Sequence, residues 1–122
     1  MNAMTSLGNG LNAAEHFEDA RSVQEAELSM LRRLGDSENN ILFVQGNLAS
    51  TYQKLGRREE AMLLRRDVYS GNLKLLGAEH FDTLREAHNY ATSLFGLERF
   101  EEGKALLRSC LLYTSPSPRD RG

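Results

Sequence analysis

The sequence predicts an all-α fold, a right-handed α-solenoid of about three antiparallel helix pairs. The segment NLASTYQKLGRREEAMLLRR (47–66) returns as NYATSLFGLERFEEGKALLR (89–108), at an offset of 42 residues. In both copies apolar residues recur at three- and four-residue spacing, which is typical of a helix with one buried face. Both prolines lie in the last seven residues, so only glycine and turn chemistry interrupt helices before Ser115.

Composition excludes several classes of protein. The 122 residues suit one domain or part of a larger one, and 40% apolar with 26% charged residues predicts a soluble globular chain. The net charge is -2 with both signs interspersed, so we predict no nucleic-acid partner. No apolar run approaches the ~20 residues that span a bilayer, so we predict no membrane partner. The single cysteine, Cys110, excludes an internal disulfide and favours a cytoplasmic location.

Helices are expected over 3–14, 17–34, 39–55, 58–76, 81–97 and 100–112. A weaker copy of the repeat supports the first pair. Its FEDA segment (17–20) matches FEEG (100–103), and LGDSENNIL (34–42) matches LGAEHFDTL (76–84). The FEDA match is one residue out of step with the offset of 42, which we interpret as a slip within a helix pair.

The middle helix pair has two apolar faces and two predicted ends. The face of its first helix consists of Leu48, Ala49, Tyr52 and Leu55. The face of its second helix consists of Ala61, Leu64, Val68, Leu75 and Leu76. Small residues in both faces suit close helix crossing. Gly56 and Gly77 are predicted to end the two helices, because glycine adopts the left-handed conformation of a C-terminal cap.

The link LGAEHFDTL (76–84) contains acids and a histidine, but it is predicted to be a turn. His80, Asp82 or Thr83 can cap the next helix, and Thr83 followed by Glu86 fits a capping box. A catalytic histidine would need a nucleophile or a fixed acid partner. The neighbourhood of His80 offers only Glu79 and Asp82.

The pattern NLA…Y..LGR.EEA…LLR…LLG.EH.DTL, which recurs as NYA…LERFEEG.ALLR, resembles the 42-residue tetratricopeptide repeat of kinesin light chains and nephrocystin. The resemblance implies repeats over 1–111, at about 1–38, 39–80 and 81–111. Three residues depart from the family pattern: Phe81 replaces proline, Arg65 a core leucine and Gly103 alanine. Residues 112–122 (LYTSPSPRDRG) are expected to form a disordered tail that resembles a translated adapter, with further repeats following Cys110 in the native protein.

The resemblance also implies a function, a scaffold or adaptor whose first helices line a concave groove for a partner peptide or helix. The candidate groove residues are Phe43, Asn47, Ser50, Lys54, Arg85, His88, Asn89, Thr92 and Phe95. An asparagine amide can pair with both groups of a peptide backbone, so Asn47 and Asn89 are candidate clamps. The alternative is that these two asparagines brace neighbouring helices.

Selectivity is expected from the charged and aromatic candidates. Lys54, Arg85 and His88 favour an acidic stretch in the partner, and Phe43 and Phe95 suit an apolar anchor. The alternative is that Lys54 and Arg85 are solvated surface charges.

The sequence contains no pattern typical of an enzyme. Its three histidines lack metal-ligand spacing, and the position of Cys110 matches that of Val68, a core position. We therefore expect no catalytic residue, metal or cofactor. Two alternative functions remain open: a regulatory repeat segment of a larger enzyme, and a co-chaperone-like clamp for a C-terminal carboxylate. The clamp needs a set of lysines and arginines, of which the groove offers Lys54 and Arg85.

Overall fold

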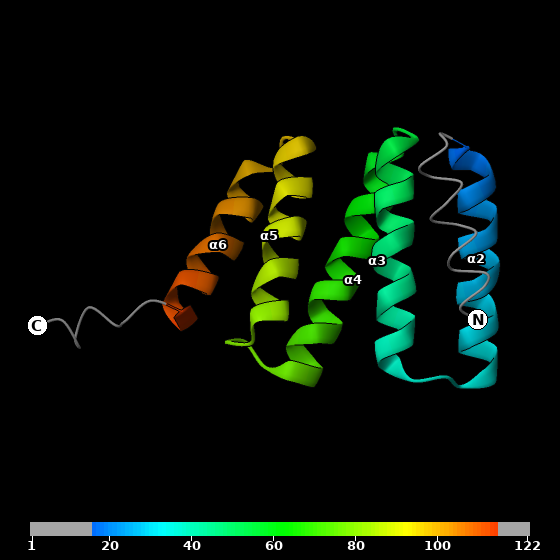
Figure 1. Cartoon of the computed structure of the whole chain (residues 1–122). Helices are drawn as coiled ribbons and strands as arrows, with labels where there is room; N and C mark the ends of the chain where they lie inside the picture. The colour runs from blue at the N-terminus through cyan, green and yellow to red at the C-terminus, as the bar shows by residue number, and fades with distance from the viewer. Residues whose placement is uncertain (1–15, 115–122) are drawn as a thin grey trace, which may run out of the picture. The chain divides into compact units, whose positions relative to one another are not determined.

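The structure is a computed structural model that describes residues 16–114, and within them the chain forms five α-helices and no strand (Figure 1). The all-α prediction is confirmed. The predicted helix over 3–14 and the part of the predicted tail from residue 115 onward lie outside the described residues. The chain divides between Val68 and Tyr69 into two compact units, which are described separately.

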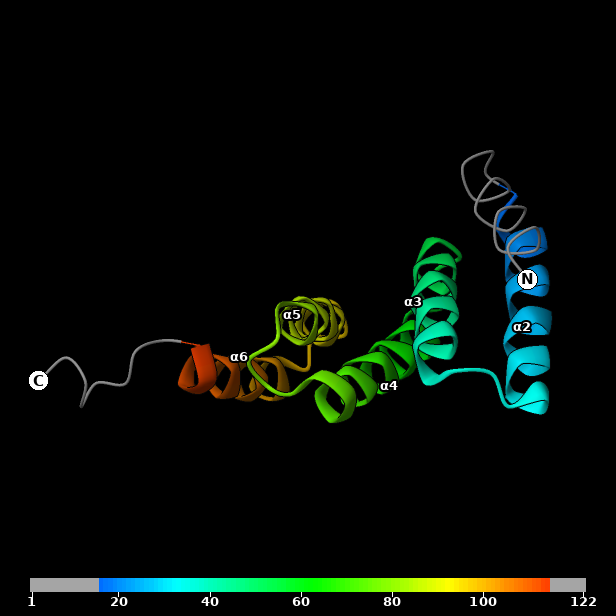
Figure 2. The same ribbon diagram turned by 60° about the horizontal axis from the view of Figure 1, so that its bottom comes forward.

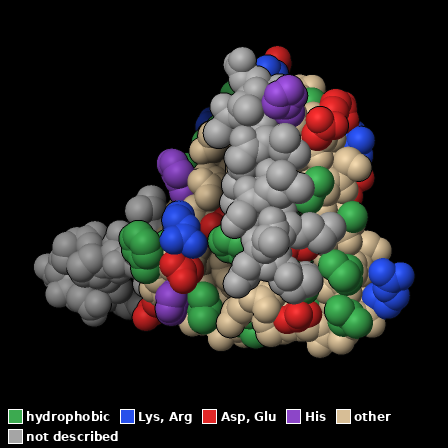
Figure 3. All heavy atoms as spheres, turned by 45° about the vertical axis from the view of Figure 1, so that its right-hand side comes forward, with side chains coloured by type: hydrophobic (Ala, Val, Ile, Leu, Met, Phe, Trp, Pro, Cys, Tyr) green, Lys and Arg blue, Asp and Glu red, His purple; other side chains and the backbone are tan. Residues whose placement is uncertain are grey.

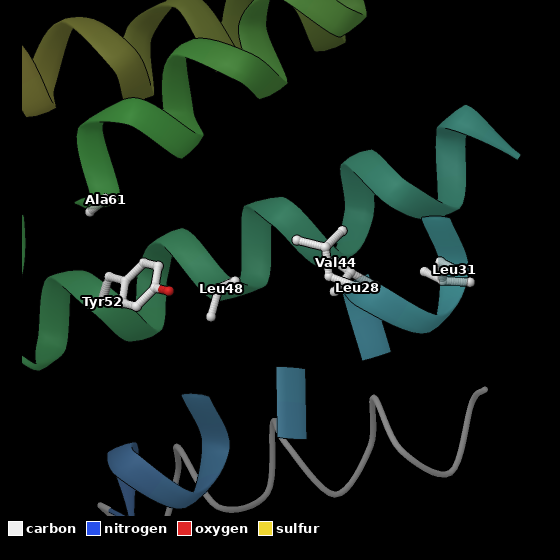
Figure 4. Packing of buried hydrophobic residues seen from close by; sticks show 6 residues of the cluster. All are labelled: Leu28, Leu31, Val44, Leu48, Tyr52 and Ala61. Carbon is white, nitrogen blue, oxygen red and sulfur yellow. The ribbon is translucent and has the colours of Figure 1, made fainter. Parts of the chain in front are cut away.

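The first unit contains α2 (Phe17–Leu34), α3 (Glu38–Lys54) and the beginning of α4 (Arg58–Leu76). Helices α2 and α3 pack side by side and are joined by a short loop (Figures 1 and 2). Their buried side chains form a core with the start of α4 (Figure 4), consisting of Leu28, Leu31, Val44, Leu48, Tyr52 and Ala61. Burying each large apolar side chain stabilises the fold by about 1.5–3 kcal/mol.

The second unit contains the rest of α4, α5 (Phe81–Gly96) and α6 (Phe100–Thr114). Helices α5 and α6 pack against each other, and α5 buries Ala87, Ala91 and Leu94. The end of α4 meets α5 through Tyr69 and Tyr90, whose ring centroids are 6.1 Å apart. The observed bounds of the five helices agree with the predicted bounds to within two residues.

Glycines end the helices where the sequence predicts them. Gly56 has φ 80° and Gly77 has φ 93°, both in the left-handed region. Beyond Gly56, the amide of Arg57 donates to the carbonyl of Tyr52 at 2.9 Å, the long bond of a Schellman motif. The predicted capping roles of Gly56 and Gly77 are therefore confirmed.

Three residues were predicted as possible N-caps of α5, and the structure shows which of them has this role. His80 is the N-cap, and its Nδ1 accepts from the backbone amide of Asp82 at 3.0 Å. Thr83 lies inside the helix, is buried, and donates its hydroxyl to the carbonyl of Asn72 at 3.2 Å. The predicted capping box of Thr83 and Glu86 is therefore wrong, because Thr83 faces the end of α4 instead of the exposed amides of its own helix.

Two departures from the repeat pattern have a structural reason. A Cβ atom at Gly103 would lie 2.7 Å from Cε1 of Phe95, so the α5–α6 crossing leaves no room for the usual alanine. Arg65, at a position expected to hold leucine, is half-buried and donates from Nη2 to Oγ of Ser50 at 3.1 Å.

Candidate functional site

Four predicted groove residues share one face of α3. Phe43, Asn47, Ser50 and Lys54 follow each other at intervals of three or four residues, which places them in one line on a helix. The side chain of Phe43 is 59% exposed. Lys54 is exposed, and its Nζ lies 5.5 Å from the ring centroid of Phe17. Among the described residues Lys54 has no carboxylate partner, so its charge is available to a ligand.

Asn47 is half-buried in this face and its amide nitrogen is unused. Its Nδ2 is enclosed and forms no hydrogen bond with any atom of the described residues. Its backbone carbonyl accepts from the hydroxyl of Thr51 at 3.2 Å. A buried amide donor without a partner costs about 1–3 kcal/mol, so the folded chain gains free energy if this donor finds an acceptor.

On the equivalent face of α5, the polar side chains pair mainly with other residues of the same helix. Arg85 forms ion pairs with Asp82 at 3.1 Å and with Glu86 at 3.4 Å. Asn89 donates from Nδ2 to Oε1 of Glu86 at 3.3 Å. His88 and Thr92 are exposed, and the Thr92 hydroxyl donates to the His88 carbonyl at 2.9 Å.

Two predicted groove residues make contacts within their own helix pair. Ser50 accepts from Arg65 of α4, as described above. Phe95 is half-buried, lies against Gly103 of α6, and stacks on Phe100 with ring centroids 6.2 Å apart. Both side chains are therefore less accessible to a partner than the exposed Phe43 and Lys54.

A second feature of the first unit is a hollow of about 470 Å³ between α2, α3 and α4. Its lining residues are Glu25, Leu28, Ser29, Arg32, Leu48, Tyr52, Glu60, Leu63 and Leu64. Both carboxylates are already engaged. Glu25 accepts from the Tyr52 hydroxyl and from Nη1 of Arg21 at 2.8 Å, and Glu60 accepts from Arg57 at 2.5 Å and 2.7 Å.

These contacts change the acidity of two groups beside the hollow. The pKa of Tyr52 is raised to about 12, mainly because the hydroxyl is buried and secondly because it is hydrogen-bonded to Glu25. The hydrogen bond from Arg57 lowers the pKa of Glu60. Arg57 also lies 4.7 Å from the centroid of the Tyr52 ring, so one arginine contacts both side chains.

Among the described residues, no group of three or more histidine, cysteine or acidic side chains is placed to hold a metal ion. Burial raises the pKa of the Cys110 thiol, the opposite of the lowered pKa that activates a nucleophile. On the face drawn in Figure 3, basic and acidic side chains of the described residues are interspersed. None of the helices described is long and apolar enough to cross a membrane.

Sequence reasoning did not identify Glu86 as part of the site. Glu86 is 9% exposed and contacts both Arg85 and Asn89. The signal was present in the repeat, because the equivalent residue 42 positions earlier is Val44, which has no acceptor. A buried carboxylate at an otherwise apolar repeat position marks a residue with a local partner.

Known proteins confirm the resemblance to the tetratricopeptide repeat. The family model described as tetratricopeptide repeat matches residues 44–82. A crystal structure from Podosopora anserina, provisionally named a kinesin light chain with nearly identical TPR-like repeats, has the same fold with TM-score 0.77 and 22% identity. A variant of that protein gives TM-score 0.79 and 21% identity. No curated protein sequence matches the chain.

These similarities define the class of the chain. In both structural comparisons 98% of this chain is covered, and it spans 59% of the length of the other chain. Helical repeats of this kind form a protein-interaction fold. The fold class and the kinesin-light-chain-like repeats predicted from the sequence are confirmed.

Proposed function

We propose that this chain is a non-enzymatic adaptor module that binds an extended, acidic peptide segment of a partner protein. The segment contacts α3 along the line of Phe43, Asn47 and Lys54. The cytoplasmic location and the absence of a cofactor are part of the same proposal. Neighbouring repeats of a longer chain would extend the binding surface.

The observation that supports this proposal is the unused hydrogen-bonding and charge capacity of α3. The enclosed amide of Asn47 has no partner among the described residues, and the ammonium of Lys54 has no carboxylate. A peptide carbonyl can accept from this buried amide only after the Asn47 side chain turns toward the peptide. The exposed ring of Phe43 lies one helical turn away, where an apolar side chain of the peptide can pack.

The preference for acids rests mainly on Lys54. Arg85 is paired with Asp82 and Glu86, so an acidic ligand must compete with two carboxylates for it. This pairing also weakens the case for a carboxylate clamp, which needs several unpaired cations. His88 is exposed on α5.

Fluorescence anisotropy with synthetic peptide pools tests the proposal. Three fluorescein-labelled pools of twelve-residue peptides carry glutamate, lysine or serine at every third position, with alanine, leucine, serine and tyrosine mixed elsewhere. The glutamate pool is expected to bind most tightly. Asn47→Ala and Lys54→Ala are each expected to weaken its binding roughly fivefold to tenfold, the effect of one lost hydrogen bond or ion contact.

Arg66→Ala is the matched control, because Arg66 is an exposed cation of the same unit that pairs with Asp67. This variant is expected to bind the glutamate pool as the wild type does. Equal binding of all three pools, or no effect of Asn47→Ala and Lys54→Ala, would contradict the proposal. If Leu63→Asp alone abolished binding, the ligand would occupy the hollow. If amidation of the peptide C-terminus abolished binding, the chain would be a carboxylate clamp.

A further inference from the structure

The hollow of the first unit lies on a different side of α3 from the line of Phe43, Asn47 and Lys54. The α3 residues that line it are Leu48 and Tyr52 (Figure 4). Tyr52 follows Phe43 by nine residues, which at about 3.6 residues per turn is two and a half turns. The two side chains therefore leave opposite sides of α3, and the hollow is a separate surface that the function proposed above does not use.

The walls of the hollow come from one stripe of α2 and one stripe of α4. The α2 wall consists of Glu25, Leu28, Ser29 and Arg32, and the α4 wall consists of Glu60, Leu63 and Leu64. Within each wall neighbouring residues are at most four positions apart, so each set occupies one face of its helix. The side chain of Leu63 is 39% exposed, and a partner that covers it removes apolar surface from water. The leucines therefore favour an apolar ligand group.

Both carboxylates that line the hollow already accept hydrogen bonds from the protein. Glu25 accepts from the Tyr52 hydroxyl and, at 2.8 Å, from Nη1 of Arg21. Arg57 donates from Nε and Nη2 to the two oxygens of Glu60, at 2.5 Å and 2.7 Å. A basic ligand group would have to compete with these arginines, so the hollow does not favour a cation.

Arg32 is the charged lining residue whose capacity is unused. It is exposed, and within residues 16–114 its side chain forms no ion pair and no hydrogen bond. It follows Glu25 by seven residues, which is about 10 Å along α2 at about 1.5 Å per residue. The free guanidinium thus lies at the opposite end of the α2 wall from the engaged carboxylate. A ligand carboxylate at that end would complement its charge.

The lining also indicates the conformation of an occupant. An extended peptide carries backbone N–H and C=O groups that need hydrogen-bond partners. The hollow is lined mainly by leucine side chains and by polar groups that already have partners. An α-helix satisfies its own backbone groups and presents only side chains to an apolar groove. The hollow therefore suits a helix better than an extended chain.

We propose that the hollow binds an amphipathic helix of a partner protein, which places two large apolar side chains in the hollow and an acidic side chain against Arg32. Two apolar residues four positions apart, with an acid three positions beyond either of them, span about 10 Å of a helix. This span equals the length of the α2 wall. The site is independent of the peptide site proposed on α3 and differs from it in the conformation of its ligand.

Helical probe peptides test the site by fluorescence anisotropy on the full chain. Twenty-residue, alanine-rich peptides labelled with fluorescein carry two leucines four positions apart and a glutamate three positions before or after the pair, so that both orientations are sampled. A matched set carries glutamine in place of glutamate. The glutamate set is expected to bind roughly threefold to fivefold more tightly than the glutamine set, the effect of one exposed ion contact.

Variants of the chain locate the binding. Leu63→Asp places a charge at the apolar opening and is expected to weaken binding of the glutamate set more than tenfold. Arg32→Ala is expected to bind the glutamate and glutamine sets equally. Arg33→Ala and Leu34→Asp are the matched controls, because both residues are exposed on α2 and neither lines the hollow. Each control is expected to change binding less than twofold.

Two further variants guard against misfolding and separate this site from the one on α3. Ser29→Tyr fills the hollow from an exposed position and is expected to weaken binding as Leu63→Asp does. Circular dichroism checks that both variants are folded. Lys54→Ala is expected to leave binding of the helical peptides unchanged, and Leu63→Asp to leave binding of the extended glutamate pool unchanged. Failure of one site therefore does not imply failure of the other.

Four results would each overturn the proposal. The first is no binding of the glutamate set, or binding that neither Leu63→Asp nor Ser29→Tyr weakens. The second is equal binding of a glutamate set with a central proline, which would make the ligand an extended segment. The third is equal binding of the glutamate and glutamine sets to the wild type. The fourth is a wild-type dimer in sedimentation that Leu63→Asp makes monomeric, since the hollow would then take a second copy of this chain.

Discussion

Gly56 and Glu98 stand at the same position in the second and third repeats, and both adopt the left-handed conformation, with φ 80° and φ 63°. The same long hydrogen bond follows each. Arg57 donates to Tyr52 at 2.9 Å, and Arg99 donates to Leu94 at 2.8 Å. Repeat position thus sets the geometry of the helix end even where the residue is unfavourable, because the bond pattern requires a positive φ.

The two repeats differ again where their helices cross. Ala61 in the second repeat corresponds to Gly103 in the third, and Gln53 corresponds to Phe95. The ring of Phe95 occupies the space where a Cβ of residue 103 would lie. A large side chain on the first helix therefore goes with the loss of a methyl group on the second.

A third difference lies in the core. Tyr52 corresponds to Leu94, and both are buried. The hydroxyl of Tyr52 also donates to Glu25 of the preceding helix, a polar link that leucine cannot make. Burial of the Tyr52 hydroxyl, together with this link, raises the pKa of Tyr52 and gives the second repeat a pH dependence that the third repeat lacks at the equivalent leucine.

The largest expected effect concerns Tyr52 at high pH. The folded pKa of Tyr52 is raised to about 12 from an ordinary value of 10.0, so the folded state retains its proton over this interval. The contribution of Tyr52 to stability is complete below pH 10 and declines as the pH rises toward 12. At 1.36 kcal/mol per pKa unit, the loss is about 2–3 kcal/mol. Urea unfolding at pH 9, 11 and 12 measures it.

Tyr52→Phe is the control for this titration, because it removes the ionisable hydroxyl and retains the ring. The difference in unfolding free energy between wild type and Tyr52→Phe is expected to shrink across the same pH interval. If that difference stayed constant from pH 9 to 12, Tyr52 would not have the raised pKa.

The crossing of α5 and α6 gives the next effect. Gly103→Ala introduces a methyl group against the Phe95 ring, and overpacking of this kind costs about 1–3 kcal/mol. In the Phe95→Gln protein, which copies the second repeat, Gly103→Ala is expected to stabilise by up to about 1 kcal/mol through helix propensity. A double-mutant cycle measured by urea unfolding gives the coupling. Additive effects of the two substitutions would show that Phe95 does not explain Gly103.

The smallest expected effect tests the helix ends. Glu98→Gly relieves a left-handed non-glycine residue and is expected to stabilise by about 0.5–1 kcal/mol. The reverse change, Gly56→Ala, is expected to destabilise by about 1 kcal/mol. Glu98→Ala retains the unfavourable φ and serves as the control in the same thermal melts. A gain from Glu98→Ala equal to that from Glu98→Gly would assign the effect to charge and not to backbone conformation.

Much of the local structure could be read from the sequence, because it depends on neighbours along the chain. Helix bounds followed from apolar spacing, and Gly56 and Gly77 ended their helices as expected. The cap of α5 could not be chosen from sequence alone. His80, Asp82 and Thr83 all have suitable side chains, and the choice depends on Thr83 facing Asn72 of the preceding helix.

The candidate site also has features that the sequence predicted and features that it could not predict. Its residues were predicted from repeat position and resemblance, and the exposure of Phe43 and Lys54 agrees with a surface role. Their role in binding a peptide stays a prediction. The engagement of Ser50 by Arg65 was not predictable, because it joins residues fifteen positions apart on two helices.

By itself the sequence determined the repeat period and the helices, since both follow from periodicity and short-range backbone preference. Only the tertiary structure decided which polar groups are already satisfied. The partner of Asn89, Glu86, lies one helical turn earlier in the same helix and follows from the sequence, but the burial of the Asn47 amide without a partner among the described residues depends on packing. Hydrogen bonding depends on differences of a few tenths of an ångström in the donor–acceptor distance, and between helices such distances are set by how the helices pack.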